Sequence, residues 1–174
     1  PACAASPHWV EPVSKADAKD FFDWAAANES QLNAAGVDVG AFHEAYWIDF
    51  NNDGKREYVF TEYQGSGGWL VLHVFQKTES GFTSAPGAFP APPELDGHGP
   101  WYKSLFGFAE LCGKTYFAAD NSRPGRLEVE IFIWDQSETR EACTPEWAAV
   151  HQDTFNRWQA AGRLANAAMY LEGT

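Results

Sequence analysis

An α+β fold is predicted for this chain: an antiparallel sheet of five to seven strands with an N-terminal and a C-terminal helix packed on it. The middle of the chain carries short runs of β-branched and aromatic residues separated by Gly, Asn and Pro. Near both ends, apolar residues recur at the spacing of a helix. With 174 residues, 45% of them hydrophobic, the chain has enough material for one core, so we expect a single domain over residues 1–174.

The first helix is expected from about Lys15 to Ala35. Ser14 is a good N-cap residue, Asp17 follows it by three positions, and Gly36 ends the helical pattern. One face of this segment should pack on the sheet. The residues on that face are Phe21, Trp24, Ala25, Asn28 and Leu32.

Strands are expected wherever β-branched and aromatic residues cluster between turn residues. These segments are residues 42–49, 57–63, 69–76, 101–111, 114–119 and 126–134. Residues 80–100 are rich in Gly and Pro and are expected to be loop over most of their length. A last helix should begin after Thr144 as its cap, with Pro145 in the first helical position.

The segment from Asp49 to Glu57 has the spacing of a cation-binding loop. Side-chain oxygens stand at its first, third, fifth and ninth positions, and Gly54 is the sixth. Oxygen ligands at this spacing suit Ca²⁺, and strand-like residues flank the loop on both sides. The alternative is a bare hairpin turn, because Asp-Gly is a strong turn signal by itself. The predicted calcium ligands are Asp49, Asn51, Asp53, Lys55 and Glu57.

The D-x-N-x-D-G-x-x-E pattern between strands resembles the calcium loop of FG-GAP or VCBS-type β repeats. It departs from an EF-hand, which has a bidentate Glu at the twelfth position, where this chain has Phe60. The resemblance implies modest calcium affinity and a structural role for the ion.

The net charge of −12 argues against a nucleic-acid partner and against anionic membrane surfaces, and it favours a cationic partner. No apolar run approaches the roughly 18 residues of a membrane span. The small residues at the start of the chain are typical of a protein after removal of an export signal, so a periplasmic or secreted location is expected. Acidity that only keeps the protein soluble is the alternative.

Three cysteines are present: Cys3, Cys112 and Cys143. In an exported protein one disulfide is expected, and a bond between Cys112 and Cys143 is favoured, although the sequence does not fix the pairing. Cys3 would then be free or would carry a lipid anchor. Three reduced thiols in a cytosolic protein are the alternative.

Catalytic signatures are missing from the sequence, so no enzymatic activity is predicted. The five histidines show no zinc-binding spacing, and no nucleophile elbow, Walker or dinucleotide motif occurs. His73 lies in an apolar strand and is expected to be structural, whereas His98 lies in the long loop. A hydrolase with dispersed carboxylates and a glycan-binding module that uses exposed tryptophans are the alternative functions.

The Ser-Gly segment that follows the cation hairpin resembles the loop that bacterial periplasmic lysozyme inhibitors insert into the hydrolase cleft. The resemblance ends at Ser66 and Gly67, because that family has a tyrosine where this chain has Leu70. Immunity proteins that protect bacteria from toxins are also acidic and exported. These resemblances imply an inhibitor of a cationic cell-wall hydrolase or toxin effector. The expected partner-binding residues are Ser66, Gly67, Gly68, Trp69 and His98.

Overall fold

The computed structural model describes residues 6–64, 69–84, 102–103, 106–120, 129–135, 138–141 and 145–160. The chain divides into two compact units, one of residues 11–102 and the other of residues 1–10 and 103–174. Each unit contains one antiparallel sheet, so the α+β class is confirmed. A single sheet of five to seven strands under both terminal helices is not confirmed, because the strands are shared between two sheets. Whether the units fold together as one domain stays a prediction.

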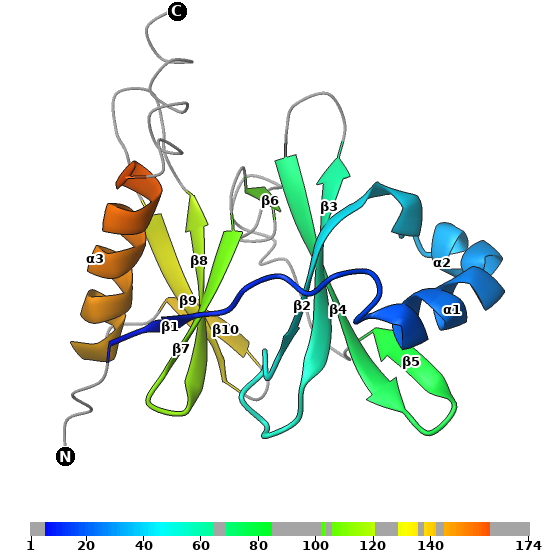
Figure 1. Ribbon diagram of the computed structural model, residues 1–174, viewed down its shortest axis with the longest axis horizontal. Helices are drawn as coiled ribbons and strands as arrows, with labels where there is room; N and C mark the ends of the chain where they lie inside the picture. The colour runs from blue at the N-terminus through cyan, green and yellow to red at the C-terminus, as the bar shows by residue number, and fades with distance from the viewer. Residues whose placement is uncertain are drawn as a thin grey trace, which may run out of the picture. The chain divides into compact units, whose positions relative to one another are not determined.

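The unit of residues 11–102 is built on the strand order β2-β3-β4-β5 (Figure 1). Each neighbouring pair is antiparallel, and β6 (Tyr102–Lys103) also pairs with β4. The four main strands are β2 (Phe42–Ile48), β3 (Glu57–Gln64), β4 (Trp69–Thr78) and β5 (Gly81–Ser84). The first three match the strands expected from the sequence, whereas β5 lies at the start of the segment expected to be loop.

The helix expected from Lys15 to Ala35 is two shorter helices, α1 (Lys19–Ala27) and α2 (Glu29–Ala34), followed by a short 3₁₀ helix, η1 (Val39–Ala41). The break falls at Asn28, whose side-chain Nδ2 donates to the carbonyl of Trp24 at 2.8 Å. An Asn side chain that bonds the preceding turn competes with helical hydrogen bonding. The prediction of one continuous helix was therefore wrong, although the predicted apolar face is the one that packs on the sheet.

The predicted cap is formed one turn before the helix itself. Ser14 Oγ donates to the Asp17 carboxylate at 2.6 Å and accepts from the Asp17 backbone N–H at 3.2 Å. The hydrogen bonds that the exposed Asp17 carboxylate accepts from the Ser14 hydroxyl and from the Ser14 backbone N–H lower its pKa. Residues 15–18 form a turn, and regular helix begins only at Lys19.

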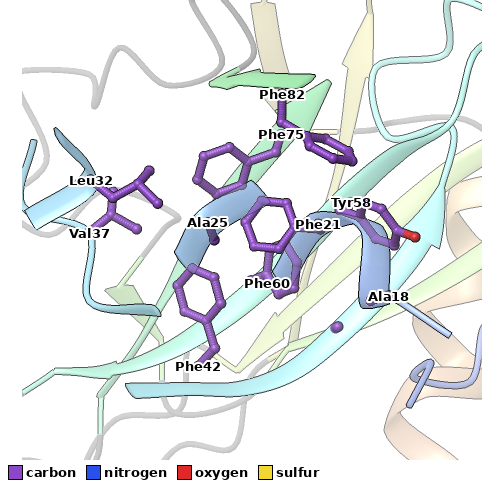
Figure 2. Close-up of a cluster of buried hydrophobic side chains, with 11 residues drawn as sticks. Ala18, Phe21, Ala25, Leu32, Val37, Phe42, Tyr58, Phe60, Phe75 and Phe82 are labelled. Carbon is purple, nitrogen blue, oxygen red and sulfur yellow. The ribbon is translucent and has the colours of Figure 1, made fainter. Parts of the chain in front are cut away.

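Phe21 is the centre of the core of this unit, and its side chain is completely buried. Figure 2 shows its ring among aromatic side chains from the sheet. The distances from its ring centroid to seven neighbouring rings run from 4.3 to 6.3 Å. Those rings belong to Phe22, Trp24, Phe42, Tyr58, Phe60, Phe75 and Phe82. We call these eight side chains the aromatic core; they hold α1 on the sheet.

Gly81, the first residue of β5, should not tolerate a side chain. Its φ is +136°, and a Cβ at this position would lie 2.4 Å from Trp24 Nε1. We expect Gly81→Ala to lower the free energy of unfolding by about 2–4 kcal/mol, since it adds a clash to backbone strain. Chemical denaturation measures the change.

Gly36→Ala is the matched control, because Gly36 also has a positive φ of +78°, but a Cβ added there would meet no atom within 4 Å. Backbone strain alone should cost about 1–2 kcal/mol there. Equal losses for the two variants would show that contact with Trp24 does not restrict Gly81.

The second unit has the strand order β1-β7-β8-β9-β10, with α3 (Pro145–Ala160) packed on β7, β8 and β9. Its five strands are β1 (His8–Trp9), β7 (Phe106–Leu111), β8 (Lys114–Asp120), β9 (Val129–Asp135) and β10 (Glu138–Glu141). The predicted start of the last helix at Pro145 is confirmed. β1 and β10 were missed, because two and four residues are too short for a periodic signal.

Trp9 ties β1 to α3 in this unit. Its indole Nε1 donates to the Asp153 carboxylate, and the Arg157 guanidinium lies 5.0 Å from the centroid of its ring. Val150 and Trp158 of α3 are buried against the sheet.

Cys112 is disulfide-bonded, while Cys3 and Cys143 lie outside the described residues. None of the helices in the described part of the chain is both long and apolar enough to cross a membrane.

Candidate cation-binding loop

The segment Asp49–Glu57 connects β2 to β3, as the sequence predicted. The last residue of β2, Ile48, is paired with the first residue of β3, Glu57. Residues 49–56 therefore close an antiparallel hairpin. Two of them have a positive φ, Asn52 at 58° and Gly54 at 88°, which is the conformation that Asn and Gly adopt most readily.

The acidic side chains of the loop fold back onto the loop's own backbone. The Asp49 carboxylate accepts hydrogen bonds from the N–H groups of Asp53 and Gly54, each at 3.0 Å. Asn51 Oδ1 accepts from the same Asp53 N–H at 3.0 Å, and Asp53 Oδ1 accepts from the Lys55 N–H at 2.8 Å. The oxygens at the first, third and fifth positions are thus turned toward the inside of the loop.

Glu57 differs from the other loop carboxylates because it is completely buried. Its Oε2 accepts from the Phe50 N–H at 2.9 Å, while its Oε1 is buried without a hydrogen-bond partner. The pKa of Glu57 is raised to about 7, mainly by burial and in part by the negative charges of Asp53 and Asp49, against the opposing hydrogen bonds. A buried carboxylate oxygen without a partner is costly, so this atom calls for a cation or a proton.

Taken alone, the described residues contain no preassembled group of three or more His, Cys, Asp or Glu side chains that could hold a metal ion. The ligand set predicted here is wider than such a group. It includes the Asn51 amide oxygen, and Lys55 can contribute only its main-chain carbonyl, since an ammonium has no lone pair. The side-chain oxygens would have to exchange some backbone hydrogen bonds for the ion.

The predicted partner-binding residues are not brought together with this loop. Ser66, Gly67, Gly68 and His98 lie outside the described residues, and of Trp69 only the backbone is described, paired with Gln64. The cation loop precedes Glu57 at one end of β3, and Gln64 is at the other end. Seven residues of strand separate the two ends by roughly 23 Å at about 3.3 Å per residue. Any effect of the cation loop on residues 65–68 would have to act along β3.

A buried pair of titratable side chains was not predicted as a pair. His73 Nε2 lies 2.5 Å from Glu62 Oε2, and their side chains are only 16% and 4% exposed. Burial lowers the pKa of His73, and the neighbouring carboxylate of Glu62 opposes that shift. The structural role expected for His73 agrees with this burial. Only the β3–β4 register, which pairs Glu62 with Val71, could have revealed the contact.

Comparison of the chain with protein-family models, curated proteins and solved structures finds no match. The resemblances to calcium-binding β repeats and to lysozyme inhibitors therefore stay predictions.

Proposed function

We propose that this chain is a calcium-stabilised, exported binding protein without catalytic activity, which inhibits a cationic cell-wall hydrolase or toxin effector. The proposal has two parts, the ion and the partner. The ion is supported by the geometry of the loop, and the partner by the charge of the chain. Each part has its own test.

The observation that carries the calcium part is the buried, unpartnered Oε1 of Glu57 beside two further carboxylates. This oxygen would be a ligand of a divalent cation, and the positive charge of the cation would offset the repulsion among Asp49, Asp53 and Glu57. Calcium accepts six to eight oxygen ligands in flexible geometry, which suits a loop that mixes carboxylate, amide and carbonyl oxygens. In this role the ion would stabilise the β2–β3 hairpin.

Asp53→Ala is expected to abolish calcium binding, because it removes the carboxylate at the central position of the pattern, which also accepts a hydrogen bond from the Lys55 N–H. Isothermal titration of chelator-treated protein with CaCl₂ measures binding directly. Asp23→Ala is the matched control, since Asp23 is an exposed aspartate on α1 that pairs with Lys19. Unaltered calcium binding by Asp53→Ala, or equal loss in both variants, would contradict the assignment.

The partner part is supported by the net charge of −12, which draws a cationic protein toward the chain by long-range attraction. We expect a cationic lysozyme or effector to be retained on the immobilised protein at low salt, with its hydrolytic activity reduced. Retention should weaken as NaCl rises from 50 to 300 mM, roughly the range over which the Debye length falls from about 14 to 6 Å. Unaltered hydrolase activity in the presence of excess protein would rule out inhibition.

The glycan-binding alternative has less support from the described tryptophans. Trp24 belongs to the aromatic core and Trp47 packs against it, while Trp158 is buried in the core of the other unit and Trp9 packs against that core. A tryptophan committed to a core is not available as a stacking platform. Co-sedimentation with insoluble peptidoglycan would restore this alternative, and turnover of glycosides would restore the hydrolase.

A further inference from the structure

A cavity of about 350 Å³ opens on the unit of residues 11–102. Its volume lies within the range of small-molecule sites, roughly 300–1,000 Å³. Residues 12–15 form one wall, Phe22 of α1 another, and strands β2 and β3 supply the rest. No residue of the cation loop lines it, so the cavity is a separate feature of the unit.

The floor of the cavity is aromatic. The rings of Phe42 and Phe60 are stacked, with centroids 4.5 Å apart and an angle of 19° between their planes. Phe22 stands edge-on to Phe60 at 5.8 Å and is half-buried. Phe42 and Phe60 belong to the aromatic core, which holds them in place (Figure 2). Phe60 is completely buried and Phe42 is 8% exposed, so the half-buried ring of Phe22 and the exposed part of Phe42 form the surface available to a flat apolar group. We call these two side chains the aromatic floor.

The ionisable residues that line the cavity are Lys15, His43 and Glu44. Val13 is bridged antiparallel to Ala45, with its N–H donating to the Ala45 carbonyl at 2.7 Å. Because the bridge is antiparallel, the chain continues from Val13 to Lys15 in the direction that leads from Ala45 to Glu44 on β2. Lys15 and Glu44 both line the cavity.

Lys15 and Glu44 differ in the contacts that their charged groups make. The Lys15 ammonium lies 5.5 Å from the Phe22 ring centroid and forms no salt bridge with a carboxylate of the described residues. The Glu44 carboxylate accepts from the Tyr46 hydroxyl through Oε2 at 2.7 Å, which fixes its position. Lys15 therefore offers an uncompensated positive charge over the aromatic floor, beside a held negative charge.

We propose that this cavity binds a free aromatic α-amino acid as its zwitterion. The carboxylate would pair with Lys15, the ammonium with Glu44, and the side chain would lie against Phe22 and the exposed part of Phe42. A ligand with only a negative charge would meet the Glu44 carboxylate, and one with only a positive charge would meet the Lys15 ammonium. A zwitterion satisfies both charges at once. This site is independent of calcium and of the proposed protein partner.

The experiment follows backbone amide shifts of the full-length protein by NMR during titration with three probes of one shape. L-Phenylalanine carries both charges, 3-phenylpropionate lacks the ammonium, and phenethylamine lacks the carboxylate. We expect L-phenylalanine to bind about three- to tenfold more tightly than either of the others, with shifts concentrated at Val13, Phe22 and Ala45.

Two charge-removing variants assign the contacts. Lys15→Gln should weaken binding of L-phenylalanine and 3-phenylpropionate about three- to tenfold, and it should tighten binding of phenethylamine, because the ammonium that repels this amine is removed. Glu44→Gln, which keeps an oxygen for the Tyr46 hydroxyl, should weaken L-phenylalanine and phenethylamine only. Lys114→Gln is the control, because Lys114 is an exposed lysine of the other unit. All three variants change exposed or half-exposed side chains, so they should fold.

The proposal is overturned if L-phenylalanine shifts no resonance near the cavity at about 20 mM, on the basis that binding this weak would be of no consequence. It is also overturned if the three probes bind with equal affinity. The same holds if neither Lys15→Gln nor Glu44→Gln weakens binding of the two probes expected to contact the charge that it removes. These results would leave the calcium and partner proposals untouched, since those rest on other residues.

Discussion

Phe21→Ala is expected to lower the free energy of unfolding of the unit of residues 11–102 by about 3–5 kcal/mol, the range for truncating a fully buried phenylalanine. Phe21 is 0% exposed, and its ring has seven aromatic neighbours within 6.3 Å. Removing it leaves a cavity that rigid rings cannot easily fill. Denaturation followed by tryptophan fluorescence measures the loss, and Trp24, 5.7 Å away, is a local reporter.

Phe22→Ala is the matched control for this prediction. It removes the same side chain from the next position of α1, where the ring is only half-buried. We expect a loss of about 1–2 kcal/mol, the ordinary size for a partly exposed site. Equal losses for the two variants would show that Phe21 does not occupy the centre of the core.

Glu57→Gln is expected to have opposite effects with and without calcium. In the calcium-free protein the pKa of Glu57 is raised to about 7 from 4.5. The folded state therefore favours the protonated carboxyl, and stability is lost as pH rises from about 4.5 through about 7. At pH 8 this loss is on the order of 3 kcal/mol, and the neutral amide avoids it. In a chelator at pH 8, Glu57→Gln should thus be more stable than the wild type.

With calcium added, the order should reverse. At a free calcium concentration of one thousand times Kd the wild-type carboxylate binds the ion and the protein gains about 4.1 kcal/mol, which exceeds the loss on the order of 3 kcal/mol, whereas the amide variant gains much less. Chemical denaturation in chelator and in calcium gives the four free energies needed. Glu29→Gln, at an exposed glutamate of α2, should change none of them. A Glu57→Gln protein that is less stable than wild type in chelator and still responds to calcium would refute the account of Glu57.

The hairpin around the cation loop was predictable because its signals are local. Side-chain oxygens and a glycine at fixed spacing, between two runs of strand-forming residues, predicted the β2–β3 hairpin. The same holds for the Ser14–Asp17 cap and for Pro145 at the start of α3. In each case the residues that interact are close in the sequence.

The features that the sequence did not predict depend on contacts between residues that are far apart in the sequence. The division of the strands into two sheets follows from pairings such as β1 with β7, which bring His8 opposite Glu110. The pairing of His73 with Glu62 needs the β3–β4 register. The complete burial of Glu57 depends on what the sheet packs against, and no pattern in residues 49–57 contains that information. The feature that best supports a cation was therefore visible only in the fold.

The central claim, that the Asp49–Glu57 loop binds calcium, is tested most directly by thermal melting of the wild-type protein in EDTA, in excess CaCl₂ and in excess MgCl₂. The account predicts that calcium raises Tm by roughly 10 °C, from about 2.7 kcal/mol spread over a unit of this size, and that magnesium raises it much less. Melting curves that coincide in EDTA and in calcium would contradict it and leave the loop as a turn.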